Sequence, residues 1–264
     1  MANYLHGYDS QEQQRLIDQA GFLGPLIYPF VDYSGCKKLL EVGSGVGAQT
    51  AVLLGLFPEL QITSVDYSEA QLAKARENLA AYSDRVRFVS QDAQELDLGE
   101  KFDSAFFCWA LEHIPDPQVV MHRVKAHLVP GAKIHLTEVF NSTFYYEPEL
   151  PALTHYYRVY NQQQRDFGGN PDVGAQLGNL LAHAGFREIE LSRSGFHLDQ
   201  SQPEELRRFV EFWKILMKSG APGLIESGLL RPDEVKAMET DLDRLLEDEN
   251  AVFFYQFVQA KATV

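Results

Sequence analysis

The chain has few cysteines and few basic residues, and both shortages narrow what it can be. Only two cysteines, Cys36 and Cys108, occur in 264 residues, far apart in the sequence. A disulfide framework or a metal site is therefore not expected, and a reducing, cytoplasmic location is predicted. Lys and Arg number 23 against 37 Asp and Glu, which gives a net charge of −14. A surface this acidic disfavours nucleic acid and anionic lipid as partners.

Long apolar runs are also missing. No stretch is long enough to span a bilayer, and the N-terminus lacks the basic-then-apolar pattern of a secretory signal. We therefore expect no membrane partner. Apolar residues nevertheless make up 45% of the chain, which suffices for one substantial core.

Apolar strand-like runs alternate with helix-like segments over the first half of the chain. The expected strands are 38–42, 61–65, 85–89, 102–108 and 132–139, and the expected helices are 46–56, 68–81 and 116–128. This alternation predicts an α/β fold with a parallel sheet and helices on both faces. A later helix, 172–184, and two strands, 186–191 and 251–258, complete the expected elements.

A glycine-rich turn joins the first expected strand to its helix. Gly43, Gly45 and Gly47 allow a positive φ and a close approach of the backbone to a ligand. The helix N-terminus behind them offers unpaired N–H groups and the positive end of the helix dipole. Asp66 ends the second strand, where a carboxylate can accept hydrogen bonds from two ribose hydroxyls. The sequence therefore predicts a site for an adenosine-containing cofactor.

Two acidic residues indicate which cofactor it is. Gly43, Gly45 and Ala48 also fit the dinucleotide pattern G-x-G-x-x-G/A, which is weak evidence alone. Glu41, two residues before Gly43, would repel a pyrophosphate but attract the ammonium group of a methionine. Asp92, after the third strand, is placed to accept from an adenine amino group. These acids favour S-adenosylmethionine (SAM) over NAD.

Together these motifs resemble a known family. Glu41 to Gly47 reads E-x-G-x-G-x-G, Asp66 and Asp92-Ala93 follow later strands, and residues 111–117 read L-E-H-x-x-D-P. This combination resembles the class I SAM-dependent methyltransferases, in the branch that includes ubiquinone and menaquinone C-methyltransferases and small-molecule methyltransferases. The resemblance covers residues 36–140 well and is weaker through 197 and at the C-terminal strand. It implies a Rossmann-like, mostly parallel seven-stranded sheet whose last strand inserts antiparallel beside the sixth.

The resemblance also implies the site residues. SAM is the expected cofactor, with S-adenosylhomocysteine (SAH) as product, and its expected contacts are Glu41, Gly43, Ser44, Gly45, Gln49, Asp66, Tyr67, Gln71, Asp92, Ala93, Cys108, Trp109 and His113. Candidates for catalysis are His113 after the fourth strand, Glu138 at the end of the fifth, and His6 and Tyr8, which could fold over from the N-terminus. Each candidate also has a purely structural interpretation, strongest for His113 and Glu138.

Two insertions interrupt the expected pattern. We expect a single domain, 1–264, made of an N-terminal cap (1–35), a cofactor-binding core (36–140), helical lid insertions (141–171 and 199–250) and a final strand (251–261). Ser201, Pro203 and Glu204 predict a helix start with a capping box. The apolar residues that follow at helical spacing either pack the helices onto the sheet or line an apolar substrate site.

The predicted function is transfer of a methyl group from SAM to an O, N or C atom of a small organic acceptor. An RNA methyltransferase is one alternative, for which Arg85/Arg87 and Arg207/Arg208 are candidate basic pairs. A non-catalytic SAM-binding protein and an NAD-linked oxidoreductase are two others. The sequence leaves the acceptor and the oligomeric state open, with a homodimer as one possibility.

Overall fold

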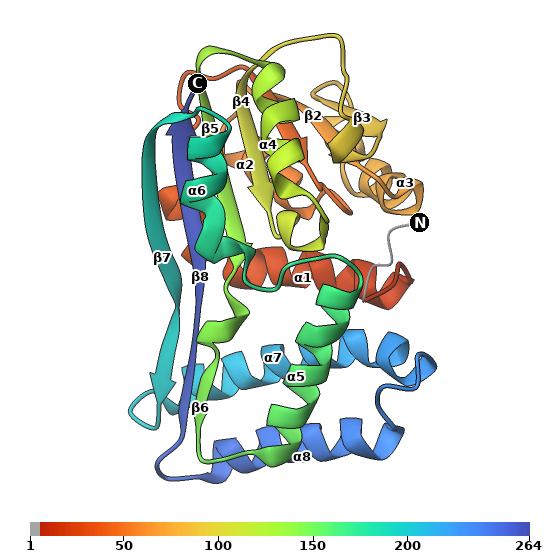
Figure 1. Cartoon of the computed structure of the whole chain (residues 1–264), viewed down its shortest axis with the longest axis vertical. Coiled ribbons are helices and arrows are strands. Elements are labelled where there is room, and N and C mark those ends of the chain that lie inside the picture. The colour runs from red at the N-terminus through yellow and green to blue at the C-terminus, as the bar shows by residue number, and fades with distance from the viewer. Residues whose placement is uncertain (1–5) are drawn as a thin grey trace.

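The computed structural model describes residues 6–264, and one eight-stranded sheet runs through it (Figure 1). Its strands are β1 (Lys38–Val42), β2 (Gln61–Asp66), β3 (Val86–Ser90), β4 (Phe102–Cys108), β5 (Leu128–Val139), β6 (Tyr145–Glu147), β7 (Arg187–Asp199) and β8 (Val252–Thr263). The order β3-β2-β1-β4-β5 is parallel throughout, and β8 then pairs antiparallel with β5. The predicted α/β fold, mostly parallel with an antiparallel last strand, is confirmed.

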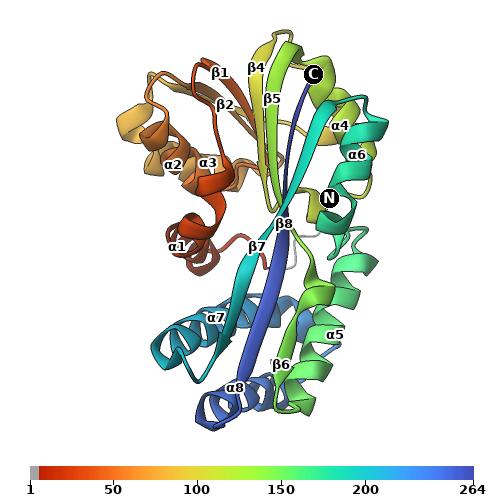
Figure 2. The same cartoon turned by 90° about the vertical axis from the view of Figure 1, so that its left-hand side faces the viewer.

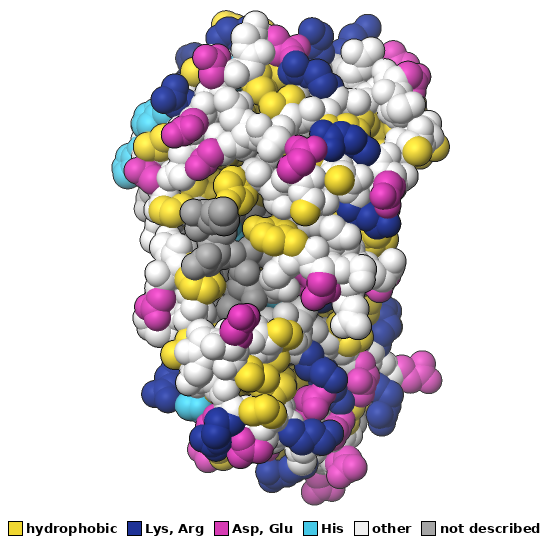
Figure 3. Space-filling view, turned by 90° about the vertical axis from the view of Figure 1, so that its right-hand side faces the viewer, with side chains coloured by type: hydrophobic (Ala, Val, Ile, Leu, Met, Phe, Trp, Pro, Cys, Tyr) yellow, Lys and Arg dark blue, Asp and Glu magenta, His cyan; other side chains and the backbone are white. Residues whose placement is uncertain are grey.

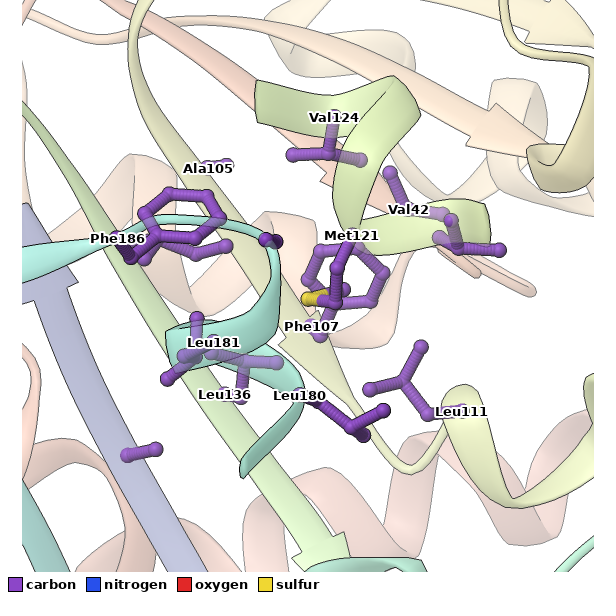
Figure 4. Close-up of a cluster of buried hydrophobic side chains, with 14 of the residues drawn as sticks. Val42, Ala105, Phe107, Leu111, Met121, Val124, Leu136, Leu180, Leu181 and Phe186 are labelled. Carbon is purple, nitrogen blue, oxygen red and sulfur yellow. The ribbon is translucent and has the colours of Figure 1, made fainter. Parts of the chain in front are cut away.

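Helices cover both faces of the parallel strands (Figure 2). They are α1 (Ser10–Ile27), α2 (Ala48–Leu56), α3 (Glu69–Asn78), α4 (Pro117–Ala126) and α6 (Leu177–His183). In Figure 4, Phe107 and Leu136 of the sheet pack with Met121 of α4 and Leu181 of α6. A second cluster packs Leu39 and Phe106 of the sheet with Leu53 of α2 on the other face. Each such side chain contributes about 1.5–3 kcal/mol by its burial.

Three further helices lie beyond the parallel strands: α5 (Pro151–Asp166), α7 (Pro203–Glu226) and α8 (Pro232–Glu247). In Figure 1 they form the bottom of the molecule, and α1 crosses between them and the parallel sheet. We call β1–β5 with α2, α3, α4 and α6 the upper half. The lower half is β6, α5, α7, α8 and the ends of β7 and β8 that extend past β5.

The long strand β8 belongs to both halves. Residues 257–263 pair with β5 and residues 252–254 pair with β6, while β7 pairs along the whole opposite edge. Phe253, Tyr255 and Phe257 face the lower core, whereas Ala260 and Ala262 face the upper core. Because neighbouring side chains on a strand point to opposite faces, β8 changes its buried face where it passes from one half to the other.

The structure corrects several expected boundaries. The strand expected at 186–191 runs on to Asp199, and the short strand β6 was not expected at all. The capping box at Ser201 is wrong: the Ser201 hydroxyl donates to the carboxylate of Asp199, and α7 begins at Pro203 without a side-chain cap. Ser201 lies one residue too early for capping, since Gln202 occupies the N-cap position.

Candidate functional site

The glycine-rich turn has the positive φ angles that its glycines allow. Gly43, Gly45 and Gly47 all have positive φ, of 75°, 53° and 75°. A Cβ on Gly43 would lie 2.4 Å from the Cβ of Ala110, whereas one on Gly45 would meet nothing within 4 Å. Gly43 is therefore required for packing, and Gly45 leaves space beside the turn. Helix α2 begins directly after the turn, at Ala48.

A cavity of about 220 Å³ opens at this turn, above the carboxyl ends of β1, β2 and β4. Open α/β sheets bind their ligands at this position. Every predicted cofactor residue except Glu41 lines this first pocket, namely Gly43, Ser44, Gly45, Gln49, Asp66, Tyr67, Gln71, Asp92, Ala93, Cys108, Trp109 and His113. Tyr8, one of the described residues before α1, also lines it.

Asp66 is held in place by two backbone N–H groups. Gly45 donates to its Oδ2 at 2.7 Å and Ser68 donates to its Oδ1 at 2.8 Å. Burial raises the pKa of the Asp66 carboxyl, and the two N–H groups oppose that shift. The side chain thus presents fixed acceptor oxygens to the first pocket.

Two other residues of the first pocket are Asp92, which a backbone hydrogen bond holds in place, and Cys108, whose pKa is shifted by its surroundings. Asp92 accepts from the backbone N–H of Gln94 at 2.8 Å and caps a short 3₁₀ helix. Burial, with the carboxyl groups of Glu138, Glu41 and Glu112 nearby, raises the pKa of the Cys108 thiol well above its ordinary value. Cys108 therefore stays a neutral thiol at physiological pH and is not an activated nucleophile.

Glu41 lies under the pocket rather than in its wall. It is 2% exposed, and its Oε2 accepts from the Thr50 hydroxyl at 2.6 Å. Burial raises the pKa of Glu41 to about 8. Near neutral pH the carboxyl is therefore mostly protonated, so its contact with a cofactor ammonium group stays a prediction.

Glu138 also lies outside both pockets. It is fully buried, and its Oε1 accepts from the backbone N–H groups of Ala110 and Leu111 at 3.0 and 2.9 Å. Burial raises the pKa of Glu138 to about 8, with the Glu112 carboxyl adding to the shift. The structure therefore places this catalytic candidate as a positioning residue, which holds the turn after β4. Trp109 precedes that turn with a φ of 53°, a conformation that costs a non-glycine residue energy.

A second cavity of about 100 Å³ lies against the first. The two share Leu16, Gln19, Trp109 and His113. Most of the other walls are aromatic or apolar side chains from α1, α5, α7 and β8, with polar groups from His6, Arg15, Glu112 and Asn141. Of the predicted catalytic residues, His113 lies between both pockets and His6 lines only the second.

Sequence reasoning missed three second-pocket residues, Arg15, Tyr160 and Tyr255. No local motif surrounds them, and only the apolar residues at helical spacing after Ser201, Trp213 among them, pointed toward an apolar site. Among residues 6–264, no group of three His, Cys, Asp or Glu side chains is arranged to hold a metal ion. No helix in that range is long and apolar enough to cross a membrane.

Comparisons with known proteins agree with this geometry. Residues 40–134 match the family described as Methyltransferase domain. The chain is 28% identical over 160 residues to O-methyltransferase cnsE of Penicillium expansum, covering 59% of this chain and 54% of the relative. It is 26% identical over 189 residues to a malonyl-acyl-carrier-protein O-methyltransferase of Bacillus cytotoxicus, covering 70% and 61%. The chain thus spans between half and two thirds of the length of these curated relatives.

A solved structure extends the likeness to nearly the whole fold. Phosphoethanolamine N-methyltransferase 2 of Haemonchus contortus, in complex with phosphomonomethylethanolamine and SAH, aligns with a TM-score of 0.55 at 21% identity. The alignment covers 95% of this chain and 52% of that one. The family match supports the methyltransferase resemblance of residues 40–134, and the solved structure shows the same fold.

Proposed function

We propose that this chain, whose residues 40–134 match the methyltransferase domain, transfers a methyl group from SAM to an O, N or C atom of a small organic acceptor. SAM binds in the first pocket and the acceptor in the second. The observation that carries this proposal is the contact between the pockets, which meet at Trp109 and His113. A methyl group can pass between two ligands only where their cavities join.

The residues of the first pocket fit SAM. Asp66 presents fixed oxygens for two ribose hydroxyls, and Asp92 offers an acceptor for the adenine amino group. The open space beside Gly45 admits the methionine end next to the start of α2. Bound SAM supplies an electrophilic methyl group on a sulfonium.

The chain contributes mainly position and exclusion of water. The transfer needs an acceptor atom aligned with the S–CH₃ bond, and correct positioning alone supplies a large part of such a rate enhancement. Leu16, Trp109 and Trp213 enclose the acceptor in apolar surface, which keeps water from the sulfonium. Helices α1, α5 and α7 cover the second pocket. Helix α8 packs behind α5 and α7 and lines neither pocket.

The acidic surface argues against RNA as the acceptor. The net charge is −14, and on the face shown in Figure 3 basic and acidic side chains are interspersed rather than gathered by sign. Neutralising a phosphate backbone requires a basic patch. A cytoplasmic location and a homodimeric state stay predictions.

Calorimetry with SAM, SAH and NAD tests the cofactor. We expect binding of SAM and SAH and no heat with NAD; the opposite pattern would favour an oxidoreductase. Transfer of label from methyl-labelled SAM to a panel of small phenols, amines and carbon acids then tests turnover. If SAH binds but no label moves with any acceptor, the chain is a SAM-binding protein without catalysis.

A further inference from the structure

Three side chains form a hydrogen-bonded chain at the edge of the second pocket. His6 lies between Ser219 of α7 and Tyr160 of α5, with 2.6 Å from its Nδ1 to the Ser219 Oγ and 2.9 Å from its Nε2 to the Tyr160 hydroxyl. His6 and Tyr160 both line the pocket. A phenol, an imidazole and an alcohol in series can relay a proton.

The contacts of Ser219 favour one tautomer of His6. The Ser219 hydroxyl lies 2.8 Å from the carbonyl oxygen of Leu216, and that oxygen can only accept, so we assign the Ser219 proton to this bond. Having only one proton, Ser219 accepts from His6, whose Nδ1 therefore carries the hydrogen. The Nε2 atom is then an acceptor and receives the Tyr160 O–H.

The surroundings keep this imidazole neutral. Burial lowers the pKa of His6 well below its ordinary value, and nearby Arg15 and His113 lower it further. Arg15 is itself paired with Glu12 at 2.6 Å, and Glu112 faces the same pocket. A neutral imidazole with an unprotonated Nε2 can take up a proton, and because its lowered pKa makes His6 a weak base, the O–CH₃ bond that forms at the same time must drive this transfer.

On the basis of the proposed function, we propose that the acceptor is a flat molecule with a phenolic or enolic hydroxyl, and that Tyr160 and His6 take its proton. The acceptor oxygen forms the new O–CH₃ bond while the S–CH₃ bond breaks and leaves its electron pair on sulfur. The hydroxyl proton moves to the Tyr160 oxygen as the Tyr160 proton moves to His6 Nε2. The positive charge of the sulfonium thereby ends on His6.

The walls of the pocket select this acceptor class. The Tyr157 and Tyr160 rings lie parallel, within 4° of each other, and Trp213 and Tyr255 add further aromatic surface. Such walls favour a flat apolar body. The Arg15 guanidinium, beside His6, favours a developing oxyanion over an ammonium group.

The tautomer can be tested without any acceptor, by ¹⁵N NMR of histidine-labelled protein, with His6→Gln identifying the His6 signals. We expect an unprotonated Nε2 and a protonated Nδ1, and loss of this preference in Ser219→Ala, which removes the Ser219 oxygen that accepts from Nδ1–H. Ser219 is a positioning residue in this scheme. A protonated Nε2 in the wild-type chain overturns the proposal.

The catalytic role is tested with two matched acceptors, 4-methylphenol and 4-methylthiophenol, and methyl-labelled SAM. A thiophenol is already ionised at neutral pH and needs no base. In His6→Gln and Tyr160→Phe we expect phenol methylation to fall by about a hundredfold or more, the usual contribution of a general base. Thiophenol methylation should stay close to the wild-type rate.

Matched controls separate this role from packing. Tyr156→Phe removes a phenol on the same helix that donates to the Met217 carbonyl and does not line the pocket, and His122→Gln alters an exposed histidine. Both should leave both reactions unchanged. Equal losses with the two acceptors, or an unchanged phenol rate in His6→Gln, overturn the proposal.

SAH affinity, measured on every variant, shows whether each is folded. It also distinguishes failure of the proposed methyltransferase function from failure of the proposed acceptor class. Absence of SAH binding by the wild-type chain refutes the proposed function itself. SAH binding without methylation of either aromatic probe refutes only the acceptor class.

Discussion

The two pockets differ in what makes their walls. The first is formed largely by turns at strand ends, where three glycines with positive φ bring the backbone close to the cavity. The second is formed by side chains that project from helices α1, α5 and α7 and from β8. A backbone-built site suits a ligand that never changes, whereas a wall of side chains can be altered by single substitutions. The upper half is thus suited to a fixed cofactor and the lower half to a particular acceptor.

The largest expected effect comes from breaking the first pocket's backbone. In Gly43→Ala the new methyl group would lie 2.4 Å from the Ala110 Cβ at a φ of 75°. Both the clash and the left-handed conformation oppose it, and we expect SAH affinity to fall by more than about a hundredfold, or about 3 kcal/mol. Isothermal calorimetry measures this directly.

Gly55→Ala is the matched control for that change. Gly55 lies inside α2, and an added Cβ meets nothing within 4 Å. It should stabilise the chain by about 0.5–1 kcal/mol in denaturant unfolding and leave SAH binding unchanged. Similar SAH affinities in the two variants would show that the turn does not hold the cofactor.

Asp66→Ala should have the next largest effect. A charge-assisted hydrogen bond contributes about 1.5–3 kcal/mol, so we expect SAH affinity to fall about ten- to a hundredfold. Asp116→Ala is the control, because Asp116 caps α4 through the Val119 N–H and does not line either pocket. That variant should lose stability without losing affinity. An Asp66→Ala variant that is folded and binds SAH normally would remove Asp66 from the ribose site.

The contrast between a first pocket built from backbone turns and a second built from side chains explains which site residues the sequence predicts well. Apart from Tyr8, Leu16 and Gln19, the first pocket draws on four short segments, 42–49, 65–71, 91–94 and 108–115, each at the end of a strand in a readable motif. Local rules of strand, turn and helix are enough to place them. Ser68, for example, the first residue of the helix expected at 68–81, caps α3 by accepting from the Gln71 N–H.

The second pocket could not be predicted in this way. Tyr160, Trp213 and His6 meet only because α5, α7 and the N-terminal segment pack together, and no short motif encodes that packing. The Glu41 and Glu138 carboxyls show the reverse problem. Both occur at expected motif positions, but burial turns them away from the pockets and into backbone or hydroxyl contacts. Burial depends on the whole fold, which the motif does not contain.

Glu138 lies where the two halves meet, and it predicts a pH effect. Its pKa is about 8 in the folded chain against 4.5 for the unfolded reference, so the folded chain keeps a proton that the unfolded chain has released. This group therefore lowers the free energy of unfolding as pH rises from 4.5 to 8. Glu138→Gln keeps the oxygen that accepts from Ala110 and Leu111 but cannot ionise.

We expect the stability of Glu138→Gln relative to the wild-type chain to increase by about 3–4 kcal/mol between pH 5 and pH 8. The comparison between the two chains cancels opposite contributions from buried histidines such as His135, whose pKa is lowered to about 4. Denaturant unfolding at both pH values measures it. A constant difference would mean that Glu138 is ionised throughout.

The smallest effect is expected in the lower half, from Trp213→Phe. Trp213 is 3% exposed and lines the second pocket, and its indole N–H has no hydrogen-bond partner among the described residues. A buried unsatisfied donor costs about 1–3 kcal/mol, so its removal offsets the apolar area lost on going to Phe. We expect the free energy of unfolding to change by less than about 1 kcal/mol. SAH affinity should not change, since Trp213 does not line the first pocket. The acceptor KM should rise if an acceptor oxygen takes this N–H.

Trp109→Phe is the matched change at the boundary, because Trp109 lines both pockets. It should alter both SAH affinity and acceptor KM, whereas Trp213→Phe should alter only the acceptor KM. If Trp213→Phe weakened SAH binding as much as Trp109→Phe did, the two halves would be energetically coupled and the cofactor site would depend on side chains of α7. An unchanged SAH affinity in Trp213→Phe would instead mean that the lower half can accept new side chains, and so new acceptors, without disturbing the cofactor.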